Sequence, residues 1–387
     1  MLSANSKYII TITGLNHLIV HAGMLILPAI FLTLITEFNT DIITLGKITM
    51  FSSFVFGLGA IPTGFLEKHT GSRTLLLICQ TGIFISGLLA FNSKSLDQLM
   101  LSLILLGLFC SMYHPAGLTM ISKRIKQTGR AMGYHGMAGN LGLAFGPLLA
   151  SWFILSYNWR FAYLTISVIS LLLLFATLVL IPARQHIQDI DEEFTVKKTD
   201  MPSLMIYYLI LILVGFTFSG FTTFLPTHFS NFSDGLLMNV KSIAKGGFLT
   251  SLVLLGGMIG QWVAGRMGDK FDKKILLSVI FIFNIPLILM VGYTENYLLL
   301  FFAFLFGITY FAYQPIGNTL LSELTHSSQR GIGYGISFFL TFGVGSAAAL
   351  IGGYLTEKEG TQLVFIYLAV IMFIALLFTV LMKRISK

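Results

Sequence analysis

Four histidines in strongly apolar surroundings are the residues of this sequence best suited to proton chemistry. His17 and His21 lie four positions apart in one apolar stretch, so they share a face if that stretch is a helix. His114 and His135 lie in two later apolar stretches. Histidine has an unperturbed pKa of about 6.5, so these side chains can bind and release protons near neutral pH. We expect them to carry protons or to contact a bound solute.

Two other interpretations of the histidines stay open. Each ring could simply hydrogen-bond a neighbouring helix, as polar residues in membrane bundles do. His17, His21 and His114 could also form a metal site, because three imidazoles are a known ligand set, although their spacing alone does not establish that they converge. Our expectation is that the chain binds no metal and no cofactor.

Carboxylates are missing from the middle of the apolar stretches. Glu37 and Asp41 fall at one edge of the predicted membrane core, and Glu323 falls at the other. A carrier of cations usually needs a buried negative charge, whereas His, Asn, Gln and Tyr can hold neutral or anionic solutes. The sequence therefore favours a neutral or anionic solute. Further polar candidates for its pathway are Asn16, Tyr113, Tyr134, Asn140, Thr217, Thr222, Gln261, Tyr310, Tyr313, Gln314 and Asn318.

The elements that must position these residues are membrane-spanning helices. Of the 387 residues, 55% are hydrophobic and only 10% are charged, against about 25% charged in a typical soluble domain. A hydrocarbon layer about 30 Å thick takes about 20 apolar residues per helix, so we expect an all-α protein embedded in the lipid bilayer. Twelve spans are predicted, at 8–36, 44–66, 74–92, 97–122, 130–156, 159–182, 203–230, 246–267, 275–294, 297–324, 331–356 and 361–383.

The distribution of positive charge predicts the orientation of the chain. An even number of spans puts both termini on one side of the membrane. If that side is cytoplasmic, eighteen of the 24 Lys and Arg residues lie on it and six lie outside, as the positive-inside rule requires. We therefore expect cytoplasmic N- and C-termini in a plasma membrane, the inner membrane if the source is a bacterium. Topology explains the net charge of +8, so we expect no nucleic-acid partner.

The second half of the chain repeats motifs of the first half at an offset of 200 residues. YHPAGLTMIS, from Tyr113, corresponds to YQPIGNTLLS, from Tyr313, and RAMGY, from Arg130, corresponds to RGIGY, from Arg330. Because each half holds six predicted spans, both halves enter the membrane from the same side, which makes the repeat parallel. The predicted segments are an N-terminal six-helix bundle over 1–183, a cytoplasmic linker over 184–202 and a C-terminal six-helix bundle over 203–387.

Two short loops carry glycine, acidic and basic residues in corresponding places. GFLEKHTGSR begins at Gly64, and GRMGDKFDKK begins at Gly265. A carboxylate at a helix end can bind donors of a neighbouring helix, so such a loop can latch one conformation. The latch candidates are Gly64, Glu67, Arg73, Gly265, Asp269, Lys273 and Lys274.

The loops, the span count and the repeat together resemble the major facilitator superfamily. Its loop signature is a glycine, an acidic residue four positions later, and basic residues at the end. The second loop fits this signature, whereas in the first loop Lys68 holds the acidic position and Glu67 precedes it. The resemblance covers the whole chain and implies transport by alternating access of two halves around a central site.

A glycine–proline segment in the fifth span, GNLGLAFGPLLA, resembles the motif that antiporters of this superfamily carry there. Its matching residues are Gly142, Gly146 and Pro147. Small residues let helices approach closely and proline frees a backbone carbonyl, so the segment can form a bendable contact, or it can be ordinary small-residue packing. The segments NHLIVH and YHPAG also resemble the fosmidomycin-resistance-like branch of drug–proton antiporters. That branch has an acidic residue near the position of His21, and this sequence lacks it.

Three hypotheses about function follow. The leading one is a monomeric secondary active transporter that couples the export of a neutral or anionic small molecule to protons. The second is an importer of an organic anion, such as a carboxylate metabolite, a metal chelate or a siderophore. The third, from another class, is a transport-inactive membrane sensor or a membrane-embedded enzyme. The sequence has no P-loop, nucleophile motif or HExxH, so we expect that it is not an enzyme.

Overall fold

The computed structural model describes residues 4–125, 128–182, 199–268, 270–326 and 330–385, and every regular element within them is helical. Twelve helical segments are long and apolar enough to cross a membrane. The predicted all-α architecture with twelve spans is thereby confirmed. The first span ends earlier than expected, because the helix stops at Ala29 and a short second helix begins at Phe31. Pro28 has no backbone N–H and so removes a hydrogen bond from the last turn before this break.

The helices of the N-terminal half are α1 (Ala4–Ala29), α2 (Phe31–Phe38), α3 (Ile42–Thr70), α4 (Ser72–Phe91), α5 (Leu96–Cys110), α6 (Tyr113–Arg124), α7 (Thr128–Ser156) and α8 (Arg160–Leu180). Those of the C-terminal half are α9 (Met201–Phe232), α10 (Ser242–Gly268), α11 (Lys273–Tyr293), α12 (Asn296–Phe311), α13 (Tyr313–Leu324), α14 (Arg330–Phe338), α15 (Ala347–Glu359) and α16 (Thr361–Ile385). A π-helical turn, Phe339–Gly343, and a 3-10 turn, Val344–Ser346, join α14 to α15 within one span.

The fourth and tenth spans break at equivalent points. The fourth span divides into α5 and α6 just before Tyr113, and the tenth divides into α12 and α13 just before Tyr313. Proline lacks a backbone N–H, so Pro115 and Pro315 cannot continue the helical hydrogen bonds across these breaks. The repeat seen in the sequence is therefore also a repeat of helix geometry.

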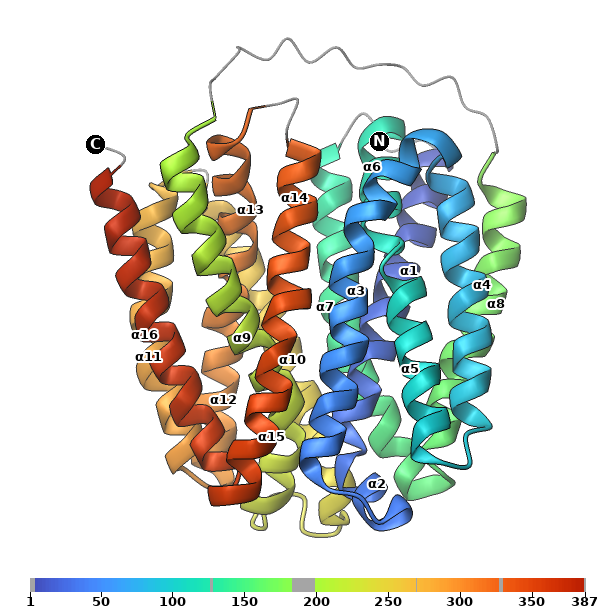
Figure 1. Cartoon of the computed structure of the whole chain (residues 1–387), viewed down its shortest axis with the longest axis vertical. Coiled ribbons are helices and arrows are strands. Elements are labelled where there is room, and N and C mark those ends of the chain that lie inside the picture. Colours follow the sequence, from blue (N-terminus) through green and yellow to red (C-terminus); the bar gives the residue numbers. More distant parts are fainter. Residues whose placement is uncertain (1–3, 126–127, 183–198, 269, 327–329, 386–387) are drawn as a thin grey trace.

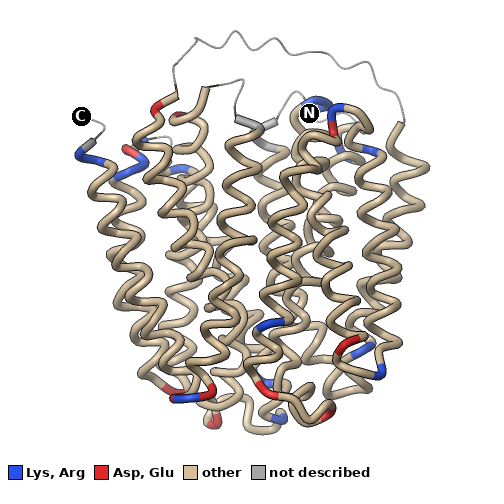
Figure 2. Tube along the Cα trace, in the orientation of Figure 1, with Lys and Arg blue, Asp and Glu red and all other residues tan. Residues whose placement is uncertain are grey.

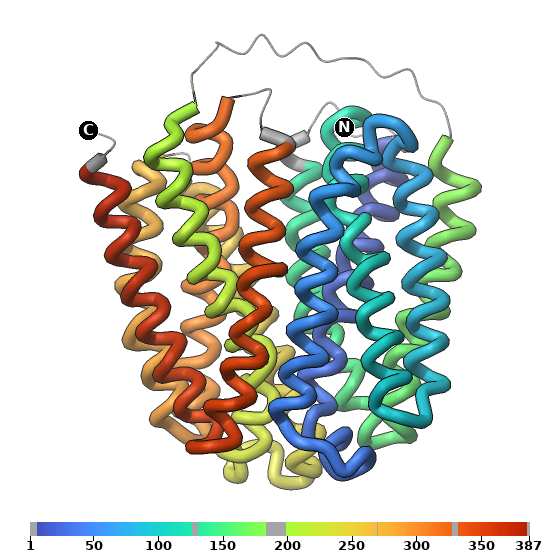
Figure 3. Tube along the Cα trace, viewed as in Figure 1, coloured from blue at the N-terminus to red at the C-terminus, as the bar shows by residue number. Residues whose placement is uncertain are grey.

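The helices form two groups that lie side by side (Figure 1), and the colour gradient of Figure 3 separates α1–α8 from α9–α16. Both chain ends lie at one face, which we call the terminal face, and the opposite face is the distal face. Charged residues gather toward these two faces (Figure 2), as the cost of placing charge in hydrocarbon requires. Residues 183–198 lie outside the described part of the chain, so the predicted linker and domain boundaries stay a prediction.

The two groups meet closely at glycines. A Cβ atom on Gly57 of α3 would collide with the backbone of Gly343, and one on Gly247 of α10 would collide with the Ser151 hydroxyl of α7. Helix α3 also packs along α15, and α1 packs against α9. Small residues at such crossings let helix backbones approach each other. The contact between the halves is therefore built mainly by α1, α3 and α7 on one side and by α9, α10, α14 and α15 on the other.

Candidate functional site

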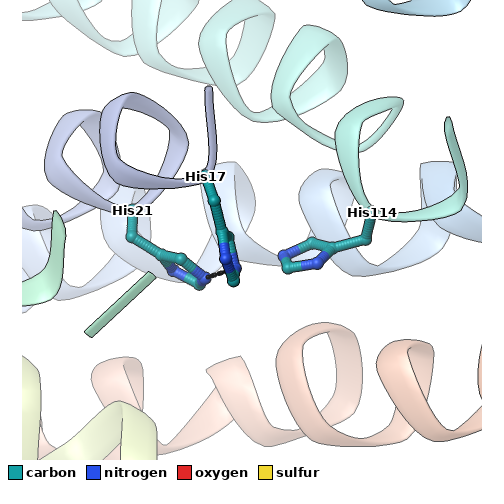
Figure 4. Close-up of side chains that lie close together, drawn as sticks. All are labelled: His17, His21 and His114. Carbon is teal, nitrogen blue, oxygen red and sulfur yellow. Dashed lines mark hydrogen bonds between the residues drawn. The ribbon is translucent and has the colours of Figure 1, made fainter. Parts of the chain in front are cut away.

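Histidines from three helices meet inside the N-terminal half, at its border with the other half. His17 and His21 come from α1, His114 from α6 and His135 from α7, and all four are buried. The ring centroid of His17 lies 4.1 Å from that of His135, 4.7 Å from that of His21 and 5.0 Å from that of His114. Figure 4 shows the His17, His21 and His114 rings pointing toward a common centre. We call these four residues the histidine cluster.

Helices α1 and α7 pack closely, and the lack of a side chain on Gly139 of α7 leaves space for the His17 ring. A Cβ atom on Gly139 of α7 would collide with the ring of His17. Farther along α7, a Cβ on Gly142 or Gly146 would collide with backbone carbonyl oxygens of α1. The sequence did not single out Gly139 as a site residue, although it opens the glycine–proline segment. The glycine spacing that resembles an antiporter motif thus also builds the wall of the histidine cluster.

Pro147, the third residue of that motif, lies where α7 meets the other half. A Cβ atom added to Gly247 of α10 would lie 2.7 Å from the Pro147 carbonyl oxygen. The motif therefore touches α1 of its own half and α10 of the other half, as a contact between the halves requires.

One hydrogen-bond chain runs through the cluster and locates its protons. The Tyr113 hydroxyl donates to the Thr13 carbonyl, so Nδ1 of His135, 3.2 Å away, donates to the Tyr113 oxygen. Nδ1 of His17 donates to the His135 carbonyl over 2.8 Å, which leaves Nε2 of His17 as an acceptor. Nε2 of His21 then donates to Nε2 of His17 over 3.0 Å. In the neutral cluster a single proton therefore lies between these two Nε2 atoms.

Two fully buried nitrogens of the cluster have no partner in the described part of the chain. Nε2 of His114 and Nε2 of His135 are buried and have no hydrogen-bond partner among the described residues. A buried polar atom without a partner costs about 1–3 kcal/mol, so these atoms call for a proton, a solute or another ligand. Glu67, near the terminal face, is the one carboxylate among the described buried residues. No described buried carboxylate therefore balances charge within the cluster.

A cavity between the two halves begins beside the cluster. Its empty volume is about 480 Å³, which includes space open to solvent. Among the described residues that form its walls, His21 is the only ionisable one, and the other polar side chains there are hydroxyls. The lining residues are His21, Met24, Leu25, Pro28, Thr49, Ser53, Phe56, Leu143, Phe218, Ser219, Thr222, Thr223, Thr341 and Phe342. Of the candidates that the sequence suggested, His21 and Thr222 line this cavity.

Phe342 is a cavity residue that the sequence did not reveal. Its ring centroid lies 6.4 Å from that of His21 and 5.4 Å from those of Phe56 and Phe218, so it contacts both halves. It sits in the π-helical turn of the eleventh span, and such turns are frequent at functional sites. Nothing in the sequence distinguishes Phe342 from the many other phenylalanines of the chain.

Several other pathway candidates bond to neighbouring helix atoms rather than face the cavity. The Asn16 amide donates to the Ile12 carbonyl over 2.8 Å. The Thr217 hydroxyl donates to the Leu213 carbonyl over 3.1 Å. Between helices, the Gln261 amide donates to the Gln314 side-chain oxygen, and the Tyr310 hydroxyl donates to the Val214 carbonyl over 2.8 Å. The first two contacts lie within one helix, and only the last two fit the helix-to-helix interpretation of polar residues.

The remaining pathway candidates are scattered. The Tyr313 ring packs beside that of Tyr310, with centroids 5.4 Å apart. The backbone carbonyl of Asn318 accepts from the Tyr334 hydroxyl. Tyr134 is 43% exposed, whereas Asn140 is buried and its amide nitrogen has no partner among the described residues. The structure therefore brings the histidines together but does not gather the neutral candidates into one pocket.

In the N-terminal half, the candidate latch loop ties neighbouring helices together near the terminal face. Glu67 is buried, accepts from the Ser72 hydroxyl over 2.7 Å and forms an ion pair of 3.1 Å with Lys123. Arg73 donates to the Ile181 carbonyl over 2.6 Å. Glu67 thus provides the charged contact, although Lys68 occupies the signature position.

In the C-terminal half, Lys273 forms an ion pair of 2.9 Å with Glu323. The backbone N–H of Lys274 donates to the carboxylate of Asp272, which caps α11 and was not among the sequence candidates. Asp269 lies outside the described residues. A Cβ added to Gly64 or Gly265 would meet no atom within 4 Å, so neither glycine is needed for close packing here.

Sequence comparison reveals related proteins. The sequence signature of the Major Facilitator Superfamily matches residues 13–244 and again residues 241–387. The probable L-galactonate transporter of Escherichia coli (strain K12) is 26% identical over 162 residues, which are 41% of this chain and 35% of that protein. The sphingosine-1-phosphate transporter SPNS2 of Danio rerio is 27% identical over 134 residues, which are 33% of this chain and 26% of that protein. The matches thus span about a third and a quarter of these relatives.

Solved structures share the whole fold. A bacterial homolog of the human lysosomal transporter Spinster, inward-facing and occupied, superposes with a TM-score of 0.77 at 15% identity, covering 99% of this chain and 97% of that one. A point mutant of the nucleoside transporter NupG superposes with a TM-score of 0.78 at 13% identity, covering 98% of this chain and 99% of that one. At these identities the similarity establishes the fold alone.

Proposed function

The chain belongs to the major facilitator superfamily, and from this premise we propose that it is a secondary active transporter that couples the export of a neutral or anionic small solute to protons. It is a multi-pass membrane transporter and not an enzyme. We further propose that it works as a monomer in the plasma membrane with cytoplasmic termini, the orientation that the positive-inside rule favours. The fosmidomycin-resistance-like branch remains part of this proposal, because it supplies the outward direction.

One observation carries the proposal: the histidine cluster reaches the solute cavity at His21. Histidine is the side chain whose ordinary pKa lies closest to physiological pH, so a group of four neighbouring histidines, three of them joined through hydrogen bonds of His17, is suited to holding an extra proton. His21 bonds to His17 and also lines the cavity. A proton bound by the cluster therefore changes the charge or the hydrogen bonding at the place where a solute would bind. Proton binding and solute binding are therefore linked at one ring.

The charge of the solute decides how that linkage works. A neutral solute that accepts or donates a hydrogen bond at neutral His21 competes with the incoming proton, which gives exchange and export. An anion pairs with protonated His21 and binds together with the proton, which gives symport. In both cases the absence of carboxylates from the cavity walls that the structure describes disfavours cations.

Import of an organic anion is therefore the second candidate. The described residues of the cavity walls include no carboxylate that would repel an anion. In addition, the names of two relatives refer to anionic solutes, L-galactonate and sphingosine-1-phosphate. A carboxylate metabolite or a metal chelate is the class of cargo that this alternative takes. Co-binding with a proton on His21 supplies its energy source.

Proteoliposome transport tests the proposal. A thermal-shift screen of L-galactonate, uridine and a cationic drug, at about pH 5.5 and about pH 7.5 on either side of the histidine pKa, first identifies a solute class that stabilises the protein. We expect proton-driven transport of that solute to be lost when His17 and His21 are both replaced by Gln. The matched control is His69→Gln, because His69 is exposed at the end of α3.

Three outcomes contradict parts of this proposal. Undiminished proton-driven transport by the double variant refutes the role of the histidines. Stabilisation by cations alone refutes the solute class. Loading the solute inside or outside the vesicles determines whether protons move against it, as in export, or with it, as in import.

A further inference from the structure

We propose that His17, His21 and His114 bind a divalent transition-metal ion whose fourth coordination position opens toward the cavity. The claim that the solute supplies the fourth ligand rests on the proposed function, whereas metal binding by the three histidines does not. No residue outside the cluster is needed for the three protein ligands.

The three rings are arranged as a ligand set. One nitrogen from each lies within 4.8 Å of the others. In a tetrahedral zinc site, metal–nitrogen bonds of about 2.0–2.1 Å place ligand nitrogens about 3.3 Å apart. The Nε2 atoms of His17 and His21 are already 3.0 Å apart, because the two residues share one face of α1. To complete the set, the His114 ring would have to bring its nitrogen from within 4.8 Å of the other two to the same centre.

The hydrogen bond behind His17 orients it as a metal ligand. Its Nδ1–H donates to the His135 carbonyl, so its Nε2 lone pair faces the centre of the cluster. Metal-bound histidines usually donate their other ring N–H to a carbonyl or carboxylate in this way, which sets the tautomer and the ring orientation. His17 therefore needs no rearrangement of protons to bind a metal.

His114 supplies the independent observation. Its Nε2 atom is buried and has no hydrogen-bond partner among the described residues, although its side chain is only 5% exposed. Figure 4 shows its ring directed at that of His17. A structural histidine normally satisfies its nitrogens when buried. An unused nitrogen at a convergence of three imidazoles is what a metal-ligand role requires.

Metal binding leaves the number of protons on the three rings unchanged. His21 donates its Nε2 proton to His17 in the metal-free cluster. When a metal takes the Nε2 lone pairs of both rings, this proton leaves Nε2 of His21 and another occupies its Nδ1, so the ring stays neutral. No oxidant or reductant takes part. The metal replaces one hydrogen bond by coordinate bonds to neutral imidazoles.

The charge of the site predicts the fourth ligand. Three neutral imidazoles leave a divalent ion with its full positive charge, and no described buried carboxylate lies nearby to compensate it. An uncompensated ion in a low-dielectric interior is costly, so the fourth ligand should be an anionic oxygen. His21 borders the cavity, which gives a carboxylate of a small solute access to this position. Imidazole ligands favour zinc, copper, nickel or iron over calcium and magnesium.

Metal titration of the full chain tests the site. The protein is purified in detergent without a polyhistidine tag, stripped with EDTA and dialysed against Zn²⁺, and bound zinc is counted by mass spectrometry. We expect about one zinc per chain, and a loss of affinity of at least about tenfold in His17→Gln or His114→Gln, since one lost ligand costs more than about 1.4 kcal/mol. His69→Gln is the matched control and should bind as the wild type does. Wild-type protein that binds no zinc, or a monodisperse His114→Gln variant with unchanged affinity, overturns the proposal.

Two further measurements protect the test against misfolded variants. His114→Cys replaces one zinc ligand by another and should restore the binding that His114→Gln loses. Co²⁺ bound to the wild-type chain should give the intense visible bands of a tetrahedral site, and weak octahedral bands would contradict the three-histidine geometry.

D-Gluconate, a simple carboxylate, tests the fourth ligand. We expect it to raise the affinity of the wild-type protein for Zn²⁺ by about tenfold. Zinc binding that gluconate leaves unchanged overturns the solute-ligand part. These titrations use no proton gradient, so their failure is separate from a failure of proton-coupled transport.

Discussion

The start of α6 and the start of α13 are built alike but are used differently. Both follow a helix break, and both carry a tyrosine, a polar residue and a proline. In α6 the polar residue is His114, whose ring enters the histidine cluster and keeps an unused nitrogen. In α13 it is Gln314, whose amide oxygen accepts a hydrogen bond from Gln261. One scaffold thus presents an ionisable group in one half and a neutral amide pair in the other.

The same contrast extends to the other cluster positions. At the 200-residue offset, His17 corresponds to Thr217, and His21 and His135 correspond to a phenylalanine and a glycine. The buried histidine of the C-terminal half, His228, has both nitrogens bonded, to the Thr361 hydroxyl at 2.7 Å and to the Val291 carbonyl at 2.8 Å. Both His114 and His228 are buried, so burial does not distinguish them. A structural histidine differs from a candidate for proton or metal chemistry in that both of its ring nitrogens have hydrogen-bond partners.

The largest expected effect is that substitutions of His114 and His228 act on different properties, transport in the first case and stability in the second. His114→Gln should lower proton-driven transport by about tenfold, equivalent to about 1.4 kcal/mol, with little change in melting temperature. His228→Gln should keep proton coupling but destabilise the fold by about 1–3 kcal/mol, because two buried partners lose good hydrogen bonds. Transport and thermal unfolding, measured on both variants, check this. Equal losses of coupling would erase the distinction between the two histidines.

Gly139 and Gly136 offer a matched pair on α7. Gly139→Ala forces a methyl group into the His17 ring and should cost about 1–3 kcal/mol of packing, with transport reduced about fivefold. Gly136→Ala should be neutral, since a Cβ there meets nothing within 4 Å. Initial transport rates of the two variants, compared with the wild type, test this difference. A tolerated Gly139→Ala would show that the position of the His17 ring does not matter.

The two terminal-face ion pairs differ in burial. The difference lies in the carboxylates, since Glu67 is 8% exposed and Glu323 is 45% exposed, whereas the lysines rank the other way, with Lys123 43% and Lys273 21% exposed. Less solvent screening should give the first pair a coupling energy of about 1 kcal/mol and the second less than about 0.5 kcal/mol. Double-mutant cycles with Gln, read by thermal unfolding, measure both values. A larger coupling in the C-terminal pair would reverse this ranking of the two halves.

The smallest effect concerns Asp41, which caps α3, while Lys241 stands at the equivalent place before α10. The Thr44 backbone N–H donates to the Asp41 carboxylate over 2.6 Å and lowers its pKa below the ordinary 3.8. A lowered folded-state pKa stabilises the protein above the unfolded pKa, and this contribution disappears as the pH falls through the folded value. Asp41→Asn should therefore lower the melting temperature by about 1 °C at neutral pH. The difference should shrink and vanish as the pH falls through the lowered folded-state pKa, and a difference that persists once Asp41 is protonated would contradict this origin.

The fold was largely readable from the sequence, because membrane spans need long apolar stretches and the repeat left matching motifs. The breaks before Tyr113 and Tyr313 also have a visible cause in the prolines that follow. The early end of the first span was not anticipated, since Phe31–Phe38 is as apolar as the helix before it. A short helix at the membrane edge differs from a continuing span only in direction, which hydropathy does not record.

The candidate site was only partly readable. The i and i+4 spacing joined His17 to His21, but convergence with His114 and His135 depends on how α6 and α7 pack, which no local pattern encodes. Gly139 could have been noticed as part of a glycine-rich face. Phe342 could not, because its position arises from a π-helical turn and from contact between the halves.

Proton flux through the reconstituted transporter tests the central claim most directly. Vesicles that contain a pH-sensitive dye receive the transported solute on one side, and the change of internal pH is recorded as the solute moves down its gradient. Wild-type protein should move protons opposite to the solute, and His17→Gln/His21→Gln should move solute with no pH change. A double variant that moves protons as the wild type does would contradict the role of the histidine cluster.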